Sequence, residues 1–383
     1  MKNKTMKINE LNIVGGGKPL RESNLELLRI FAMLVIIAHH MVVNSTVIDC
    51  MDFSHPTSHT YFLMVWGMWG KTAINSFILI SGYFLCKGRL TWQRYLKLLV
   101  EIYFYKFFIM VLFALSGYEP LTFKSLAQAL FGPLRAVNNG FSASFLAFYL
   151  FVPIYNALIG ALNKRQHALM LCGLLLYFTV ASTFLNAMSM NEPFWYMTLY
   201  FIAAYIRLYP NRWTESRRVS LLVFAGSVVA SVVSVLVVIW CLGHAGVLTD
   251  FCKLPLFLVT KLQSHASQLA YWFVSDSNKL LALVVGLSAF LVAKNAPKFH
   301  SKMINTMSAG TFAVLLIHAS SDAMRRWLWQ DVVGMPELYT QPIFLMVIVS
   351  VLTPIVVFGV GTTIDYFRRE WIEQPMMKRM NRM

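Results

Sequence analysis

The stretch LLRIFAMLVIIAHH, residues 27–40, decides how this chain can fold. It is almost wholly apolar and long enough to predict a helix that crosses a lipid bilayer. Arg29 near its start and His40 at its end are charged or titratable groups, which are costly in hydrocarbon and usually functional there. Eleven positions, or about three helical turns, separate them, so both side chains should leave the same face of the helix.

The other polar groups of this stretch extend the candidate site. A rise of about 1.5 Å per residue places His40 roughly 16 Å deeper in the bilayer than Arg29. Glu26 lies one turn before Arg29, where its carboxylate can pair with the guanidinium, whereas His39 points about 100° away from His40. Four polar groups in one membrane helix favour a functional site, although interfacial anchoring and interhelical hydrogen bonds would also explain them.

The composition of the whole chain is that of a membrane protein. Of its 383 residues, 57% are hydrophobic and only 13% are charged, whereas about a quarter of the residues of a soluble globular protein are charged. Long apolar runs recur along the whole length, which predicts an all-α, polytopic bundle of transmembrane helices. We expect ten spans, at residues 25–45, 71–87, 95–117, 142–162, 168–187, 194–209, 219–242, 279–294, 309–330 and 341–364.

The basic residues predict the orientation of these spans. Most of the 33 Lys and Arg residues fall in the N-terminal tail, in the even-numbered loops and at the C-terminus. By the positive-inside rule, this alternation places both termini in the cytoplasm. The expected domains are a cytoplasmic basic tail (1–24), a transmembrane domain (25–366) and a second cytoplasmic basic tail (367–383). The net charge of +16 then reflects topology, and no basic patch with interleaved aromatic residues indicates nucleic-acid binding.

Further polar groups lie within or beside other predicted spans. The second span contains Asn75 and, near its cytoplasmic end, Ser81, and His318 lies inside the ninth span. Close helix packing or an interhelical hydrogen bond is the plain structural explanation for each. Arg94 and Lys97, one turn apart at the start of the third span, could bind anionic lipid, set the topology or hold the phosphates of a nucleotide-bearing ligand.

Two further predictions concern charge and metals. Glu101 and Lys106 both lie in the third span, and we expect them to neutralise each other. His55 and His59 have the spacing of a helical metal site, but Pro56 argues against a helix there. The five cysteines form no CxxC pair, so we expect no metal site.

The motifs around these residues resemble those of the integral-membrane acyltransferase 3 family, the bacterial O-acyltransferases that modify cell-surface glycans. The most specific match is an acidic residue, an arginine and, after ten intervening residues, a histidine, which fall on Glu26, Arg29 and His40. The matching segments occur in family order over nearly the whole chain: NLELLRIFAMLVIIAHH, INSFILISGYFL, QRYLKLL, FYLFVPIYNALI, WYMTLYFIAAYIRLY and AGTFAVLLIH.

The resemblance implies an enzyme of the bacterial cytoplasmic membrane. An acyl group, most often acetyl, would move from cytoplasmic acyl-CoA, the donor substrate, to a hydroxyl of an extracytoplasmic or lipid-linked polysaccharide. His40 would act as a general base or be acylated first. The candidate residues are His40, Arg29 and Glu26 in the catalytic set; Arg29, Ser81, Arg94 and Lys97 in the donor-binding set; and His39, Asn75 and His318 in the supporting set.

Two other functions are consistent with the same residues. The histidines and Arg29 could line the path of a membrane transporter for an anionic or proton-coupled solute. The absence of an internal repeat in the sequence argues against this alternative. The chain could also be a non-catalytic partner in glycan assembly.

Overall fold

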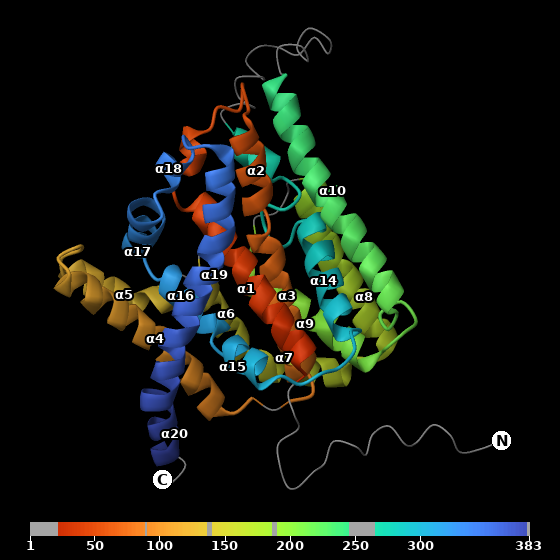
Figure 1. Cartoon of the computed structure of the whole chain (residues 1–383). Helices are drawn as coiled ribbons and strands as arrows, with labels where there is room; N and C mark the ends of the chain where they lie inside the picture. The colour runs from red at the N-terminus through yellow and green to blue at the C-terminus, as the bar shows by residue number, and fades with distance from the viewer. Residues whose placement is uncertain (1–21, 89, 136–139, 186–189, 245–264, 381–383) are drawn as a thin grey trace.

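The computed structural model describes residues 22–88, 90–135, 140–185, 190–244 and 265–380. Within these ranges every regular element is helical, which confirms the predicted all-α class (Figure 1). The predicted N-terminal tail lies outside the described residues as far as residue 21. The elements are α1 (Ser23–Val43), η1 (Val47–Cys50), α2 (Ser58–Gly67), α3 (Gly70–Leu85), α4 (Trp92–Leu115), α5 (Phe123–Arg135), α6 (Phe141–Leu150), α7 (Val152–Ala161), α8 (Lys164–Leu175), η2 (Leu176–Leu185), α9 (Glu192–Leu208), α10 (Arg217–Gly243), α13 (Ala266–Ala270), α14 (Leu280–Lys294), α15 (Lys302–Ser308), α16 (Thr311–His318), α17 (Asp322–Arg326), η3 (Trp327–Val332), α18 (Met335–Leu338), α19 (Ile343–Arg368), η4 (Arg369–Glu373) and α20 (Gln374–Met380).

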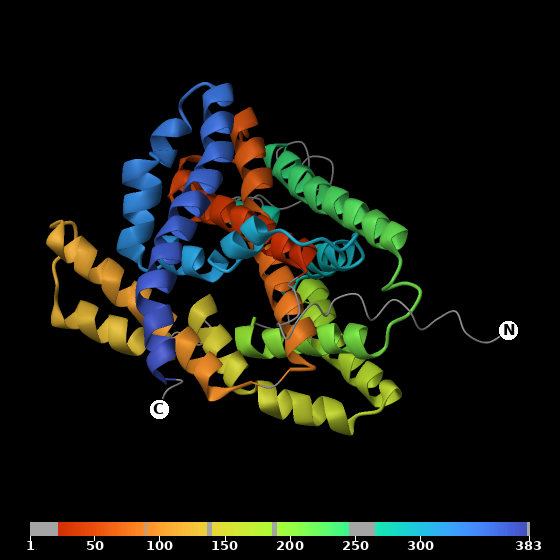
Figure 2. The same ribbon diagram turned by 60° about the horizontal axis from the view of Figure 1, so that its bottom comes forward.

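Helix α1 lies near the centre of the bundle in both ribbon views (Figure 1, Figure 2). It packs against α2, α3, α14, α15, α16 and α19. Its side chains Ile37, Met41 and Val42 are fully buried among these neighbours. In a membrane, such close packing between helices is a main source of stability, because lipid tails are as apolar as the side chains themselves.

Six helical segments are long and apolar enough to cross a membrane, or eight if each of two bent helix pairs forms one span. Each of the ten predicted segments overlaps one or more helices of the described residues. However, α14 has only 15 residues and α9 has 17, which is short for a complete crossing. By length and composition, the described residues therefore supply six to eight candidate spans, and the count of ten stays a prediction.

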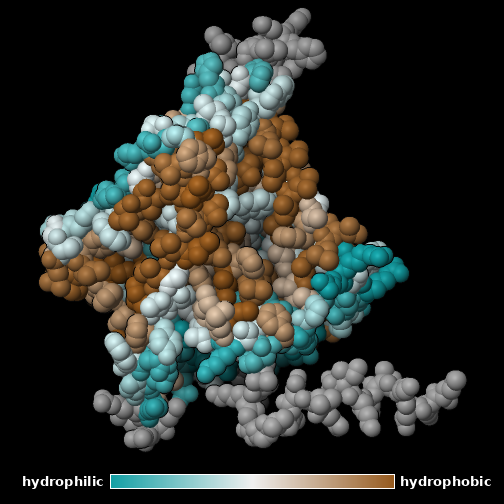
Figure 3. All heavy atoms as spheres, viewed as in Figure 1, coloured by the Kyte–Doolittle hydropathy of each residue, from teal (hydrophilic) through white to brown (hydrophobic). Residues whose placement is uncertain are grey.

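The apolar surface forms a band across the face of the molecule that Figure 3 shows. Figure 3 shows hydrophobic residues gathered across the middle of this face and hydrophilic residues toward its upper and lower ends. Leu222 and Val229 of α10 and Ile355 of α19 are each more than half exposed. An exposed apolar surface of this extent suits contact with lipid tails.

The ninth predicted span, 309–330, is not one continuous helix. Helix α16 ends at His318, α17 begins at Asp322, and the helical segments on the two sides of this break differ in direction by 97°. Ser321 caps α17, because its Oγ accepts a hydrogen bond from the Met324 N–H at 3.1 Å. Past the break, Arg325 of α17 lines a cavity together with residues of α4 and α5.

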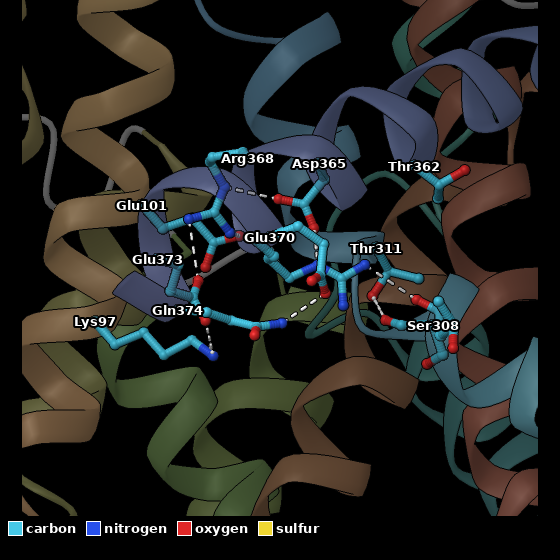
Figure 4. Close-up of polar contacts among 12 residues, drawn as sticks. Lys97, Glu101, Ser308, Thr311, Thr362, Asp365, Arg368, Glu370, Glu373 and Gln374 are labelled. Carbon is cyan, nitrogen blue, oxygen red and sulfur yellow. Dashed lines mark hydrogen bonds and ion pairs between the residues drawn. The ribbon is translucent and has the colours of Figure 1, made fainter. Parts of the chain in front are cut away.

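At its C-terminal end, α19 continues past residue 366, the predicted limit of the membrane domain, and leads through η4 into α20. The Arg368 guanidinium is buried there. It pairs with the carboxylates of Glu101 at 3.4 Å, Asp365 at 2.8 Å and Glu373 at 3.1 Å (Figure 4). Lys97 also pairs with Glu373, at 2.5 Å. A buried arginine needs such partners, so this cluster ties the C-terminal segment to α4.

Asn75 connects α3 to two neighbouring segments. Its Nδ2 donates to the carbonyl oxygens of Ser277 and Ala282, at 2.7 and 3.0 Å. Its Oδ1 accepts a hydrogen bond from the Trp195 indole at 2.9 Å. Gly286 of α14 allows this close approach, because a Cβ at that position would lie 2.6 Å from the Asn75 Cβ.

We expect Gly286→Ala to lower the free energy of unfolding by about 1–3 kcal/mol, the usual cost of overpacking. The added methyl would also lie 2.6 Å from the Thr72 carbonyl oxygen, and a backbone atom cannot turn aside as a flexible side chain can. The temperature midpoint of aggregation in detergent measures the effect. Gly226→Ala is the matched control, since nothing lies within 4 Å of its added Cβ. Equal midpoints for the two variants would contradict this packing.

Candidate active site

A cavity of about 660 Å³ runs along one face of α1. Arg29 and His40 both line it, as their spacing predicts. The α1 wall consists of Arg29, Met33, Ile36 and His40, and α3 contributes Ile74, Phe77 and Ser81. The cavity therefore joins the arginine at the start of α1 to the histidine near its end.

Charged side chains gather where α4, the α15 region and the C-terminal segment meet. Those that line the cavity there are Lys97, Glu101, His300, Lys302, Arg368, Arg369, Glu370 and Glu373. Arg369 pairs with Asp365 at 2.8 Å and donates to the Thr306 carbonyl oxygen at 3.2 Å. Because both signs of charge are present, an anionic ligand at this end would replace carboxylates as the partners of the cations.

The Arg29 guanidinium is held in place by a carboxylate that lies outside the cavity lining. Its Nη1 lies 3.2 Å from Oε2 of Glu26, so the predicted pair is confirmed. The Ser308 hydroxyl donates to the same Oε2 at 2.5 Å. Glu26 is buried and does not line the cavity. Glu26 therefore orients Arg29 instead of contacting a ligand in the cavity.

His40 forms a hydrogen bond with His318. The His40 Nδ1 lies 3.0 Å from the His318 Nε2, and the His318 Nδ1 lies 2.6 Å from the Val314 carbonyl oxygen. His318 is fully buried and is the last residue of α16. The backbone of α16 thus fixes one imidazole, and that imidazole contacts the other.

These two contacts determine the tautomers of the neutral rings. A carbonyl oxygen can only accept, so His318 donates from Nδ1 to Val314 and carries a lone pair on Nε2. That lone pair accepts the Nδ1–H of His40, which leaves the lone pair of the His40 Nε2 available to a ligand. His40 can therefore take up a proton at Nε2 while keeping its hydrogen bond to His318.

A second, smaller cavity of about 250 Å³ also contains His40 in its lining. It shares His40, Phe141 and Leu315 with the larger cavity. On α4, the larger cavity ends at Glu101 and the smaller one begins at Ile102. His40 therefore stands at the junction of two spaces, where one imidazole can contact ligands from both.

The other donor-binding candidates differ in position. Ser81 lines the larger cavity, and its hydroxyl donates to the Phe77 carbonyl oxygen at 2.9 Å. Lys97 also lines that cavity but already pairs with Glu373. Arg94, one turn earlier on α4, is not among the residues that line it.

His39 and Asn75 line neither cavity. The His39 Nδ1 lies 2.5 Å from the Gly67 carbonyl oxygen and donates to it. A Cβ at Gly70 would lie 2.3 Å from the His39 ring, so the imidazole packs closely on the start of α3. In this structure both polar side chains join helices to one another.

The charged cluster at the end of α19 was not predicted from the sequence. Arg368 and Arg369 were expected in a tail, although Asp365 lies three and four positions before them, the spacing of helical ion pairs. The expected neutralisation of Glu101 by Lys106 is wrong. Glu101 pairs with Arg368, whereas Lys106 lines the smaller cavity. Residues five positions apart on a helix point about 140° away from each other, which explains the error.

The family model described as an acyltransferase domain, that of the acyltransferase 3 family, matches residues 22–361. The matched region contains Arg29, His40 and His318. No curated protein and no solved structure matches the chain. Since the matched region covers most of the sequence, this chain belongs to the acyltransferase 3 family.

Proposed function

We propose that this protein is a membrane-embedded O-acyltransferase that moves an acetyl group from cytoplasmic acetyl-CoA to a hydroxyl of an extracytoplasmic or lipid-linked polysaccharide. Family membership supports acyl transfer. The observation that carries the rest is the cavity that joins Arg29 to His40, with the His40 Nε2 available to accept a proton. In this proposal the chain lies in the bacterial cytoplasmic membrane, with ten spans and both termini in the cytoplasm.

The lining of the larger cavity supports an acyl-CoA donor. Its charged end can accept the donor's phosphates, with cations such as Lys97 exchanging a carboxylate partner for a phosphate. Aromatic side chains offer apolar contacts to the pantetheine arm: Phe77, Phe141, Phe145 and Phe312. In this placement the phosphates lie near Lys97, the arm passes Arg29, and the thioester lies beside His40.

At His40 the proposed reaction is a direct transfer. The His40 Nε2 removes the proton of the acceptor hydroxyl as the hydroxyl oxygen attacks the thioester carbonyl carbon. The carbon–sulfur bond then breaks, and the coenzyme A thiolate takes the proton from the imidazolium. His318 keeps its hydrogen bond to the His40 Nδ1 and supports the transient charge. Trapping of an acetyl-histidine at residue 40 would instead indicate transfer in two steps.

Acetyl transfer in membranes tests this function. Membranes that contain the protein, supplied with radiolabelled acetyl-CoA, should label the extracted surface polysaccharide, and mild base should release the label as expected for an O-ester. Mass spectrometry should find the acetyl group only in glycan from cells that have the protein. Counterflow of a solute in proteoliposomes, without thioester cleavage, would contradict the proposal and favour a transporter.

We expect Arg29→Gln to raise the KM for acetyl-CoA about tenfold, because one charge-assisted contact to the donor is lost. Initial rates in proteoliposomes measure this. The single change also leaves Glu26 without its cation, so Glu26→Gln/Arg29→Gln should be compared and should show a similar KM. Arg326→Gln, exposed and outside both cavities, is the control. A wild-type KM in both Arg29 variants would show that this arginine does not bind the donor.

A further inference from the structure

The smaller cavity has a charge pattern that donor binding does not explain. Among the described residues that line it are two cations, Lys106 of α4 and Arg325 of α17, and no carboxylate. The hydroxyls of Ser142 and Ser320 also line it, and most of its other residues are apolar. A space with this lining favours an occupant that is negatively charged and rich in hydrogen-bonding groups.

Lys106 is a cation within a helix long and apolar enough to span the membrane. It forms neither an ion pair nor a hydrogen bond within the described part of the chain. Its Nζ atom lies close to Gly132 of α5, since a Cβ added to that glycine would lie 3.5 Å from it. A charged side chain at membrane depth is costly and usually marks a substrate or ion site. Lys106 therefore indicates an anionic partner that enters the cavity.

Two buried polar atoms that line the smaller cavity also indicate that a ligand binds there. The Ser320 Oγ and the Arg325 Nε have no hydrogen-bond partner among the described residues. The Arg325 Nη1 does pair with Asp322 at 2.9 Å, but the Asp322 side chain is 97% exposed and lies outside the cavity lining. Since buried polar groups in native proteins almost always find partners, these atoms indicate a ligand that accepts hydrogen bonds.

We propose that the smaller cavity is the acceptor site and that it takes a negatively charged saccharide. Lys106 and Arg325 pair with the carboxylate or phosphate of this saccharide, and one of its hydroxyls reaches the His40 Nε2. A volume of about 250 Å³ is slightly below the usual range of ligand pockets, about 300–1,000 Å³, so it holds a small unit such as one sugar of a longer chain. This inference rests on the proposed function, because it assigns the acceptor of the same reaction.

With the acceptor in the smaller cavity, the negative charges of the donor and of the acceptor lie in different cavities. The donor phosphates belong to the larger cavity, whose charged end includes Lys97 and Lys302. The acceptor anion belongs to the smaller one, and the described residues that line both cavities are His40, Phe141 and Leu315. Like charges therefore lie in separate cavities that meet at His40, and the reacting hydroxyl and thioester meet beside its imidazole.

The first experiment identifies the recognised anion. Proteoliposomes of the full chain receive labelled acetyl-CoA and purified surface polysaccharide in three forms: untreated, carboxyl-reduced and freed of phosphate with hydrofluoric acid. We expect the KM for the glycan to rise about tenfold in the form that has lost the recognised group. A rise after carboxyl reduction identifies a uronate, and a rise after phosphate removal identifies a phosphate. Equal KM values for all three forms would overturn the inference.

The second experiment tests the residues. Lys106→Gln and Arg325→Gln should each raise the KM for untreated glycan about tenfold and narrow the difference in KM between the three forms. The KM for acetyl-CoA should stay at the wild-type value. Lys106→Arg should restore glycan affinity, because it keeps the charge. Arg326→Gln is the matched control, a neighbouring exposed arginine outside the cavity lining.

The outcomes separate this inference from the proposed function. A wild-type KM for untreated glycan in both glutamine variants would refute the acceptor site while leaving acetyl transfer intact. Failure of the wild-type protein to label any glycan would instead refute the proposed function. If Lys106→Gln does not fold, Arg325→Gln carries the same comparison, since the Arg325 side chain is 39% exposed and its loss is tolerated more easily.

Discussion

His40→Ala should lower acetyl transfer to the polysaccharide on the order of 10³-fold, the usual contribution of a positioned general base. The variant keeps Arg29 and the charged end of the larger cavity, so the donor should still bind. We therefore expect kcat to fall while the KM for acetyl-CoA stays near the wild-type value. Steady-state rates in proteoliposomes with labelled acetyl-CoA separate these two quantities.

The neighbouring His39 provides a control for this result. It is the same residue type on the same helix, but its ring packs at the start of α3 and lines neither cavity. His39→Gln should retain a transfer rate within a few-fold of wild type. The substitution should instead lower the thermal stability of the protein. Undiminished transfer by His40→Ala, or an equal loss in both variants, would rule out His40 as the base.

His318→Phe should lower kcat on the order of 10²-fold, because it removes the acceptor that fixes the tautomer of His40. Without that acceptor, the proton of the neutral ring can reside on Nε2, and His40 then cannot act as a base there. The KM for acetyl-CoA should change little, since His318 does not line the larger cavity. The same proteoliposome assay measures both constants.

The conservative variant His318→Gln shows whether His318 acts by positioning the His40 ring or only by packing in the core. In His318→Gln the side-chain carbonyl can accept the Nδ1–H of His40, and the amide can donate to the Val314 carbonyl oxygen. We therefore expect His318→Gln to recover at least tenfold of the rate lost in His318→Phe. Both variants should first be shown to have similar thermal midpoints. Equal rates at equal stability would mean that His318 does not act through His40.

The periodicity of α1 determined the core of the candidate site directly. The positions of Glu26, Arg29 and His40 on one helix follow from 3.6 residues per turn, a local property that any partner helix leaves unchanged. The same reasoning predicted the Glu26–Arg29 pair, which the structure contains. Composition was equally informative about the all-α class, because backbone groups within a bilayer must be satisfied inside each helix.

Contacts between helices required the tertiary structure. His40 and His318 are 278 positions apart, and no local pattern relates them. Their pairing depends on the end of α16 at His318, after which the chain bends by 97° and places Ser320 and Arg325 beside Lys106. In the sequence, this break lies inside residues 309–330, which were predicted as one span. The ion-pair partner of Glu101 was likewise set by packing, since Arg368, which faces it, lies at the end of a helix far away in the sequence.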